Sequence, residues 1–298
     1  MQVDILGSLV VRSNDTEVVI AAGKPRALLT VLALHRNEVV PTDRLVDELW
    51  AGEAPATAVK IVQGYVSQLR RLTGDDALET RPGGYLLRLG PDDLDAARLE
   101  RLVTAGREAS AGGDPERASS ILRQALELWR GPPLDEFRFQ QFAATEISRL
   151  EELHLLAIEA RLDAELALGR HEQVVPELQA IVQVHPLREN LRRLLMLALY
   201  RAGRQADALA AYQNARKALV EGLGVDPGEE LRELESAILS HDPALALPRP
   251  SRTTTRERHT PPHPNTPPDP KAAGATRSGT RRSAAPPCLL YTSPSPRD

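Results

Sequence analysis

The residues best placed for chemistry lie on one side of a predicted helix over residues 58–72. This side is polar and partly cationic, has no acidic residue, and its members recur three or four positions apart: Lys60, Gln63, Gly64, Ser67, Arg70 and Arg71. The opposite side is apolar, and its members are Val59, Val62, Tyr65, Val66, Leu69 and Leu72. A helix that enters the major groove of DNA needs this arrangement, because its back packs on the domain while its front meets base edges and phosphates.

The polar residues of this helix suggest two roles. We expect Lys60, Gln63 and Ser67 to select the DNA sequence, since a glutamine can bind adenine through two hydrogen bonds. Gly64 lets the helix approach the bases closely, and the two arginines lie near the C-terminal end, where phosphate contacts position a protein without reading sequence. A solvated amphipathic helix with a basic end has the same pattern, so the neighbouring elements must decide between the two interpretations.

Those neighbouring elements follow a characteristic order. Two short strands, VDILGSLVV and EVVIA, flank a turn at SND, and a helix over GKPRALLTVLALHRN follows with Pro25 in its first turn. Thr42 is the predicted N-cap of the short helix DRLVDELW, and we also expect it to contact DNA. Strands, three helices and a closing hairpin are the order of a winged helix-turn-helix with an N-terminal sheet.

The closing hairpin is the segment LETRPGGYLLRL, with a Pro-Gly-Gly turn. It would form the wing. Its tip could lay Arg81 on a minor-groove phosphate, whereas Tyr85 is expected to pack in the core.

Residues 1–90 resemble the DNA-binding domain of the OmpR-type winged-helix family. The resemblance is carried by LVDELW (45–50), YVSQLRRL (65–72) and TRPGGYLL (80–87). It implies that the third helix enters the major groove, that the wing touches the adjacent minor groove, and that the loop 51–57 is a candidate surface for RNA polymerase. Gln68 stands where relatives usually have a basic residue, so one phosphate contact is expected to be missing.

The stretch 93–243 has the pattern of paired helices. The segments ALGRH (167–171) and RAGRQ (201–205) lie 34 residues apart, which is the period of tetratricopeptide repeats. Such repeats bury a continuous core between stacked helix pairs and present a concave surface to a partner. We expect Trp129 to be a packing residue, and His171 and His185 to lie at repeat turns.

This half resembles the bacterial transcriptional activator domain. The segments that carry the resemblance are LELWRGPPL (126–134), RLEELHLLAIEARLDAELALGRH (149–171), HPLRENLRRLLMLALYRAGRQADAL (185–209) and LGVDPGEEL (223–231). A winged helix followed directly by this domain is the layout of the Streptomyces antibiotic regulatory protein family. The resemblance implies an activator of secondary-metabolite (antibiotic) gene clusters that binds direct repeats in promoter DNA and recruits RNA polymerase holoenzyme, as a homodimer or as tandem copies.

We therefore expect a mainly α-helical chain, with a winged helix over 1–92 and an all-α, tetratricopeptide-like domain over 93–243. Residues 244–287 are rich in Pro and Arg, and we expect a disordered linker there. The last eleven residues, CLLYTSPSPRD (288–298), can be back-translated into the end sequence and adaptor of a transposase-based sequencing library. We interpret them as read-through, which leaves Cys288 without a redox role.

Composition limits the classes of function. The 298-residue chain has a formal net charge of −4, and residues 1–95 hold ten Lys and Arg against fourteen Asp and Glu. Any DNA site must therefore be a local patch, and a single copy should bind weakly. No segment approaches the ~18 apolar residues of a membrane span, and the N-terminus does not look like a signal peptide. We expect a cytoplasmic, nucleoid-associated protein.

No catalytic pattern stands out in the sequence. The seven histidines are scattered without metal-ligand spacing, and no nucleophile elbow or phosphate loop is found. We expect no enzyme, no metal and no cofactor. Two alternatives stay open: a helical-repeat scaffold that binds proteins, and the N-terminal part of a larger nucleotide-gated regulator with a downstream ATPase module.

Overall fold

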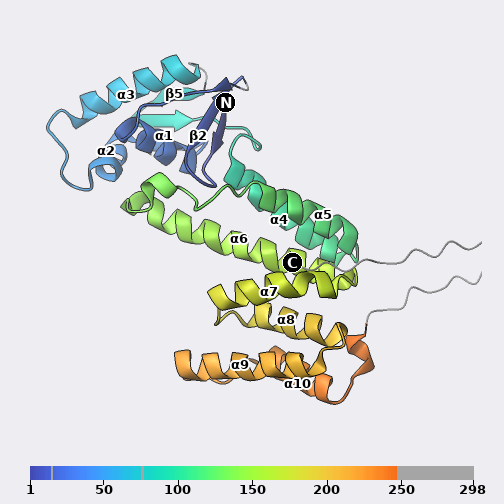
Figure 1. Ribbon diagram of the computed structural model, residues 1–298. Coiled ribbons are helices and arrows are strands. Elements are labelled where there is room, and N and C mark those ends of the chain that lie inside the picture. The colour runs from blue at the N-terminus through green and yellow to red at the C-terminus, as the bar shows by residue number, and fades with distance from the viewer. Residues whose placement is uncertain (15, 75–76, 247–298) are drawn as a thin grey trace, which may run out of the picture. The chain divides into compact units, whose positions relative to one another are not determined.

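The computed structural model describes residues 1–14, 16–74 and 77–246 (Figure 1). It opens with an antiparallel sheet in the order β1–β2–β3, formed by Gln2–Asp4, Val10–Ser13 and Thr16–Glu17. The segment VDILGSLVV, predicted as one strand, contributes two, because the chain reverses so that Val3 pairs with Val11. That prediction was wrong because Ile5 and Leu6 are buried in the reversal and donate their N–H groups to the Asp95 carboxylate instead of a strand.

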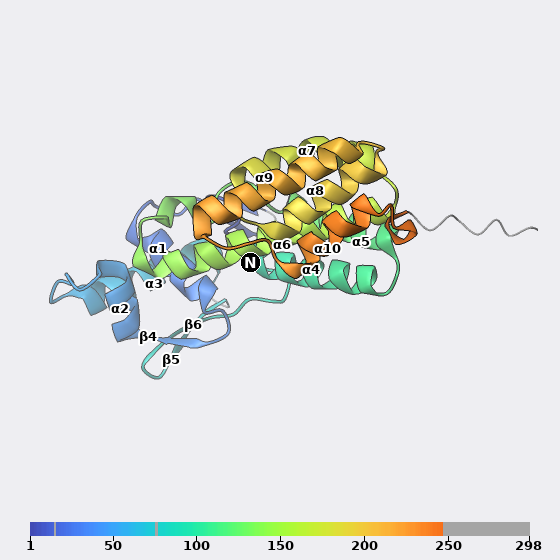
Figure 2. The ribbon, with the colours of Figure 1, turned by 90° about the horizontal axis from the view of Figure 1, so that it is seen from below.

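Three helices and a second sheet complete the winged helix. The helices are α1 (Lys24–Leu34), α2 (Thr42–Trp50) and α3 (Ala58–Thr73). The second sheet has the order β4–β6–β5 and is formed by Val39–Pro41, Gly84–Leu87 and Leu78–Arg81. The hairpin β5–β6 is the predicted wing, and Figure 2 shows it beside β4.

The role predicted for Thr42 as an N-cap was wrong. Helix α2 begins at Thr42 itself, and Pro41, the last residue of β4, holds the flanking position. The Thr42 N–H donates to the carbonyl of Gly83 at 3.0 Å, and its Oγ1 lies 3.4 Å from the same oxygen. Thr42 is therefore bonded to the wing turn. This is possible because β4 stays paired with β6 up to Pro41, the residue just before the helix.

The rest of the described chain is helical, as predicted. Its helices α4 to α10 are stacked along the chain, as Figures 1 and 2 show. The elements are α4 (Asp95–Ala111), α5 (Pro115–Glu127), the 3-10 turn η1 (Asp135–Phe137), α6 (Gln141–Ala167), α7 (His171–Val184), α8 (Glu189–Arg201), α9 (Gln205–Leu223), α10 (Glu229–Leu239) and the 3-10 turn η2 (Pro243–Leu245). Helix α5 packs on α4 and α6, and α8 packs on α7 and α9.

The repeat is visible in the turns that join the helices. Gly169 follows α6 and Gly203 follows α8, both with positive φ (79° and 75°). In both turns the next residue, an arginine, donates its N–H to a carbonyl five positions back, from Arg170 to Glu165 and from Arg204 to Leu199. Gly113 makes the same turn between α4 and α5, with a φ of 77° and a bond from Asp114 to Ala109. The sequence indicated the two later turns, and the structure adds the first.

The apolar core falls into two clusters. The first runs from the winged helix through α4 and α5 into the first half of α6, and it includes Leu28, Leu69, Leu99 and Leu150. The second begins at Leu155 and fills the space between the later helices. Packing is thus continuous across residue 92, and the 27-residue helix α6 contributes to both clusters.

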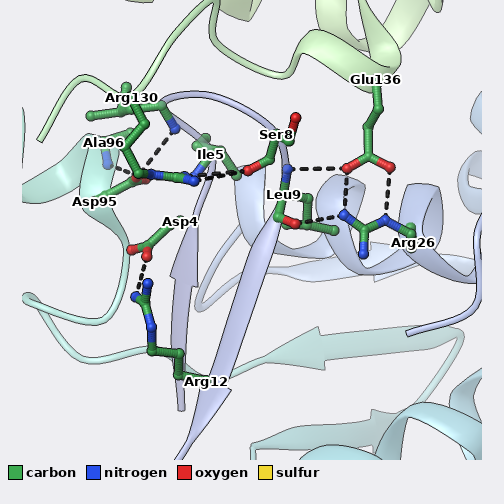
Figure 3. A network of polar contacts seen from close by, with 11 residues as sticks. Asp4, Ile5, Ser8, Leu9, Arg12, Arg26, Asp95, Ala96, Arg130 and Glu136 are labelled. Carbon is green, nitrogen blue, oxygen red and sulfur yellow. Dashed lines mark hydrogen bonds and ion pairs between the residues drawn. The ribbon is translucent and has the colours of Figure 1, made fainter. Parts of the chain in front are cut away.

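Polar contacts also join the winged helix to the helices that follow it (Figure 3). Asp95, 2% exposed, accepts hydrogen bonds from the N–H groups of Ile5 (2.8 Å) and Leu6 (2.9 Å). Glu136 pairs with the Arg26 guanidinium at 2.6 and 2.7 Å and accepts the N–H of Leu9 at 3.0 Å. These carboxylates satisfy backbone donors that the first sheet leaves without a strand partner.

Among the described residues, no helix is both long enough and apolar enough to cross a membrane. The linker expected over 244–287 overlaps η2 at its first two residues and from 247 onward lies outside the described residues, as does the segment 288–298 with Cys288.

Candidate nucleic-acid interface

The apolar back of α3 anchors it to the winged helix. Val62, Val66 and Leu69 are buried against a core that α1 and α2 share. Val59 and Leu72, predicted on the same apolar side, are 44% and 38% exposed. That part of the prediction was wrong, because the buried stripe of α3 extends to Ala58 and Thr73 at its two ends, and Val59 and Leu72 lie to either side of this stripe.

The polar front of α3 is open to solvent. Lys60, Gln63, Gly64, Ser67 and Arg71 are all exposed. Within the described part of the chain, the structure gives no hydrogen bond or ion pair to the side chains of Lys60, Gln63 and Arg71. The Ser67 hydroxyl donates to the Gln63 carbonyl at 3.0 Å, and a Cβ at Gly64 would meet no atom within 4 Å. The front is therefore a row of free donors and acceptors around a flat point at Gly64.

Arg70 differs from its neighbour Arg71. It is half-buried, and its Nε donates to the carbonyl of Leu78 at 2.8 Å while its Nη2 donates to Thr80 Oγ1 at 2.8 Å. Both partners lie on β5. The side chain predicted as a phosphate ligand thus ties the end of the recognition helix to the wing, with only Nη1 uncommitted.

The wing carries a charge network that sequence reasoning missed. Glu79 is ion-paired to Arg81 and, at 2.8 Å, to Arg88. The hydrogen bond from Arg88, supported by that from Arg81, holds the pKa of Glu79 below its ordinary value. Arg81 is exposed as predicted, but part of its charge is neutralised by the neighbouring carboxylate. The i, i+2 spacing of Glu79 and Arg81 on one strand was the available signal.

Two further expectations concern the surroundings of α3. Tyr85 is buried in the first core cluster, as predicted. The loop 51–57 between α2 and α3 is exposed throughout, and it leaves α2 through a left-handed conformation at Ala51, with φ of 50°. Its exposure makes it accessible to a protein partner.

Aromatic and histidine residues in the helical part have packing roles. The Trp129 ring stacks on His154 with centroids 4.0 Å apart, which fits the packing role predicted for it. Burial lowers the pKa of His154. His171 and His185 are the first residue of α7 and the residue after it, at the repeat turns as predicted. Within the described residues, no group of three or more His, Cys, Asp or Glu side chains could hold a metal ion.

Comparison with protein families identifies two regions. Residues 94–239 match the family described as the bacterial transcriptional activator domain. Residues 16–87 match the family described as transcriptional regulatory protein, C terminal. The two matches follow one another with a gap of a few residues, and both families are of transcriptional regulators.

Comparison with individual proteins gives relatives over most of the chain. The regulatory protein DnrI of Streptomyces peucetius is 42% identical over 256 residues, which are 82% of this chain and 94% of DnrI. The regulatory protein AfsR of Streptomyces coelicolor is 44% identical over 76% of this chain, but the match spans only 23% of AfsR. The solved structure of Mycobacterium tuberculosis EmbR in complex with a low-affinity phosphopeptide has 38% identity and a TM-score of 0.78, over 81% of this chain and 65% of that one.

Proposed function

The chain belongs to the Streptomyces antibiotic regulatory protein family of DNA-binding transcriptional regulators, and from that premise we propose that it activates a secondary-metabolite gene cluster. It acts in the cytoplasm, on the nucleoid, by binding direct repeats in promoter DNA and recruiting RNA polymerase holoenzyme. The observation that carries the proposal is the open polar front of α3, which an apolar back anchors to the domain.

In this proposal, some residues of the front contact bases and others contact phosphates. Lys60, Gln63 and Ser67 meet base edges at the centre of the helix, and Gly64 lets the backbone come close to them. Arg71 meets a phosphate at the C-terminal end, and Arg81 meets one from the wing after releasing part of its bond to Glu79. Thr42 and Arg70 act mainly through the wing, since both are hydrogen-bonded to it.

Binding by one copy is weak in this proposal. The winged-helix part carries more acidic than basic residues, so long-range attraction to DNA is small and the local patch must supply the affinity. Copies on adjacent half-sites raise the effective concentration of one another and make occupancy cooperative. The exposed loop 51–57 and the helical part are the surfaces proposed for polymerase.

Footprinting on the intergenic regions beside neighbouring biosynthetic genes tests the proposal. The expected result is protection of repeated sites of equal length, with occupancy that rises cooperatively with protein concentration. Gln63→Ala should change the preferred bases within each site, whereas Lys217→Gln, on an exposed residue of α9, should bind as the wild type does. Equal loss on specific and random duplexes for Gln63→Ala would contradict the role of this residue.

A second candidate is that the chain is one part of a longer nucleotide-gated regulator. The match to AfsR covers about a quarter of that protein, so a relative of this chain can be much longer, which favours the longer chain of this proposal. Re-sequencing the gene past codon 287 tests this candidate: an open reading frame that continues into a phosphate-binding loop would support it, and a stop codon would exclude it.

A further inference from the structure

The helical part contains a groove that the proposed DNA-binding function does not use. It lies between α7, α8 and α9, with a volume of about 820 Å³. Its floor is formed by the buried side chains of Val182, Leu195 and Leu199, together with one charged residue, Arg192. Its walls carry exposed amides, from Gln179 and Gln183 on α7 and Asn214 on α9.

Arg192 is unusual among the buried charges of this protein. It is 6% exposed, and its Nε donates to the carbonyl of Pro186 at 2.6 Å. Within the described part of the chain, no carboxylate lies within ion-pair distance of its guanidinium. Burial alone lowers its pKa, with no acidic group to offset the effect. A buried arginine that is bonded to a neutral carbonyl but not to a carboxylate carries a free-energy cost that this hydrogen bond offsets only in part.

The repeat shows that the fold does not require a charge there. The residue 34 positions earlier is Ile158, which packs against the second core cluster as an ordinary apolar side chain. An apolar residue at position 192 would therefore suit the same helix-pair geometry. The charge at this position has to be explained by something other than packing.

The preceding repeat turn, between α6 and α7, has a charge arrangement that the later turn lacks. There Arg170 and Arg123 pair with the buried carboxylate of Glu165, which also accepts a hydrogen bond from Ser119 at 2.7 Å. Thirty-four residues later, Arg204 corresponds to Arg170 but Leu199 takes the place of Glu165. The first turn therefore contains a buried carboxylate, and the second turn, beside the groove that contains Arg192, has leucine at that position.

We propose that the groove between α7, α8 and α9 binds an extended peptide segment of a partner protein that presents one carboxylate to Arg192. The apolar floor beside Arg192 takes an adjacent aliphatic side chain, and the amides of the walls, which both donate and accept, pair with the peptide backbone. Arg192 to Leu199 spans about 10 Å of helix, the length of about three extended residues. Arg204 adds no net charge, since its Nε is bonded to Asp207 at 2.7 Å, so the groove favours a single anionic group.

Binding of short peptides to the full chain tests the proposal. The probes are fluorescein-labelled pentapeptides with amidated ends, composed of Ala, Leu and Ser around one Glu, each paired with a twin that has Gln instead. A second set lacks Glu and has a free C-terminal carboxylate. Fluorescence polarisation should show Glu peptides or free-terminus peptides binding at least about ten-fold tighter than their neutral twins, as expected of a charge-assisted, partly buried contact.

Three variants make the test specific. Arg192→Met should remove the preference for the carboxylate and leave the melting temperature equal or higher, since a buried charge without a carboxylate partner is replaced by an apolar chain of similar length. Arg193→Met is the matched control, because this neighbour pairs with Asp163 outside the groove, and it should retain the preference. Ala210→Trp fills the groove from an exposed wall position, so it should block binding without touching Arg192.

Four results would overturn the proposal. They are the absence of any acidic peptide with a Kd below about 1 mM, a preference that survives Arg192→Met, displacement of the peptide by acetate or benzoate at similar concentrations, and loss of promoter DNA affinity in Arg192→Met. The third would assign the groove to small carboxylates and the fourth to nucleic acid. Since the DNA affinity of each variant is measured separately, failure here leaves the proposed function standing.

Discussion

At the scale of single residues, the cations around α3 differ in what already holds them. Arg71 and Lys60 are exposed and have no partner in the described residues, whereas Arg70 and Arg81 are bound to groups of the wing. The net free energy of a phosphate contact is most favourable when the cation does not have to break an existing hydrogen bond or ion pair. Arg71 is therefore the residue at which loss of phosphate attraction can be measured most cleanly.

We predict that Arg71→Gln weakens binding to promoter and random duplexes by the same factor. It should also reduce the slope of log affinity against log salt by about one, since one phosphate contact is lost. The measurement is a salt titration of a mobility shift or of fluorescence anisotropy, with Lys217→Gln as the control. An unchanged salt slope in Arg71→Gln would show that this arginine does not touch the backbone of DNA.

Glu165 is the residue whose protonation should matter most for stability. Burial alone would raise its pKa, but hydrogen bonds from Arg170, Ser119 and Arg123 outweigh burial and lower it to about 2. The folded state therefore favours the ionised form. Its stabilisation is complete above about pH 4.5, the ordinary value, and is lost as the pH falls toward 2.

We predict that Glu165→Gln lowers the free energy of unfolding at pH 7 by on the order of 2–3 kcal/mol. The difference from wild type should shrink between pH 4.5 and 2, which urea unfolding at a series of pH values measures. Glu221→Gln, at an exposed ion pair with Lys217, is the matched control and should change little. A Glu165→Gln deficit that is independent of pH would mean that the loss is one of packing.

At the scale of elements, two glycines differ in whether the fold requires them: Gly84 lies in the wing and Gly64 lies on the front of α3. A Cβ at Gly84 would lie 2.1 Å from the Val40 carbonyl oxygen, because Gly84 is paired with Pro41 at the end of the antiparallel strands β4 and β6. A Cβ at Gly64 would meet nothing within 4 Å. The first glycine is needed by the wing, and the second has no structural reason to be a glycine within a helix.

We predict opposite results for alanine at these two positions. Gly64→Ala should raise stability by up to about 1 kcal/mol, since alanine favours helix, and should still weaken DNA binding if the backbone approaches the bases there. Gly84→Ala should lower the melting temperature and displace the wing. Thermal melts and DNA affinity are measured on both variants, and Gly64→Ala with wild-type affinity would remove Gly64 from the proposed interface.

At the scale of the whole molecule, the winged helix and the first helices of the activator domain share one core and one polar network. Asp95 and Glu136 accept hydrogen bonds from backbone donors of the β1–β2 connection, which lie 89 or more residues away in the sequence. Burial raises the pKa of Asp95, and the hydrogen bonds from Ile5 and Leu6 offset only part of that effect. We therefore expect these regions to unfold together.

We predict that Asp95→Ala destabilises the winged helix as well as α4. Two buried N–H groups would lose their acceptor, at a cost of about 2–4 kcal/mol. Calorimetry should show the transition that includes the winged helix moving to lower temperature, while Asp92→Ala, at an exposed residue, should leave it in place. Melting of the winged helix at its wild-type temperature in Asp95→Ala would show that the two regions are thermodynamically independent.

The sequence by itself determined the order of the elements, the 34-residue repeat and the polar front of α3. These features depend on local periodicity and on turn residues such as Gly169 and Gly203, which determine the backbone conformation only of the few residues around them. Tertiary structure alone decided that Arg70 is bonded to the wing, that Asp95 accepts from Ile5 and Leu6, and that no carboxylate of the described residues lies within ion-pair distance of Arg192. Each of these depends on contacts between residues of different elements. The spacing of residues along one element does not specify such contacts.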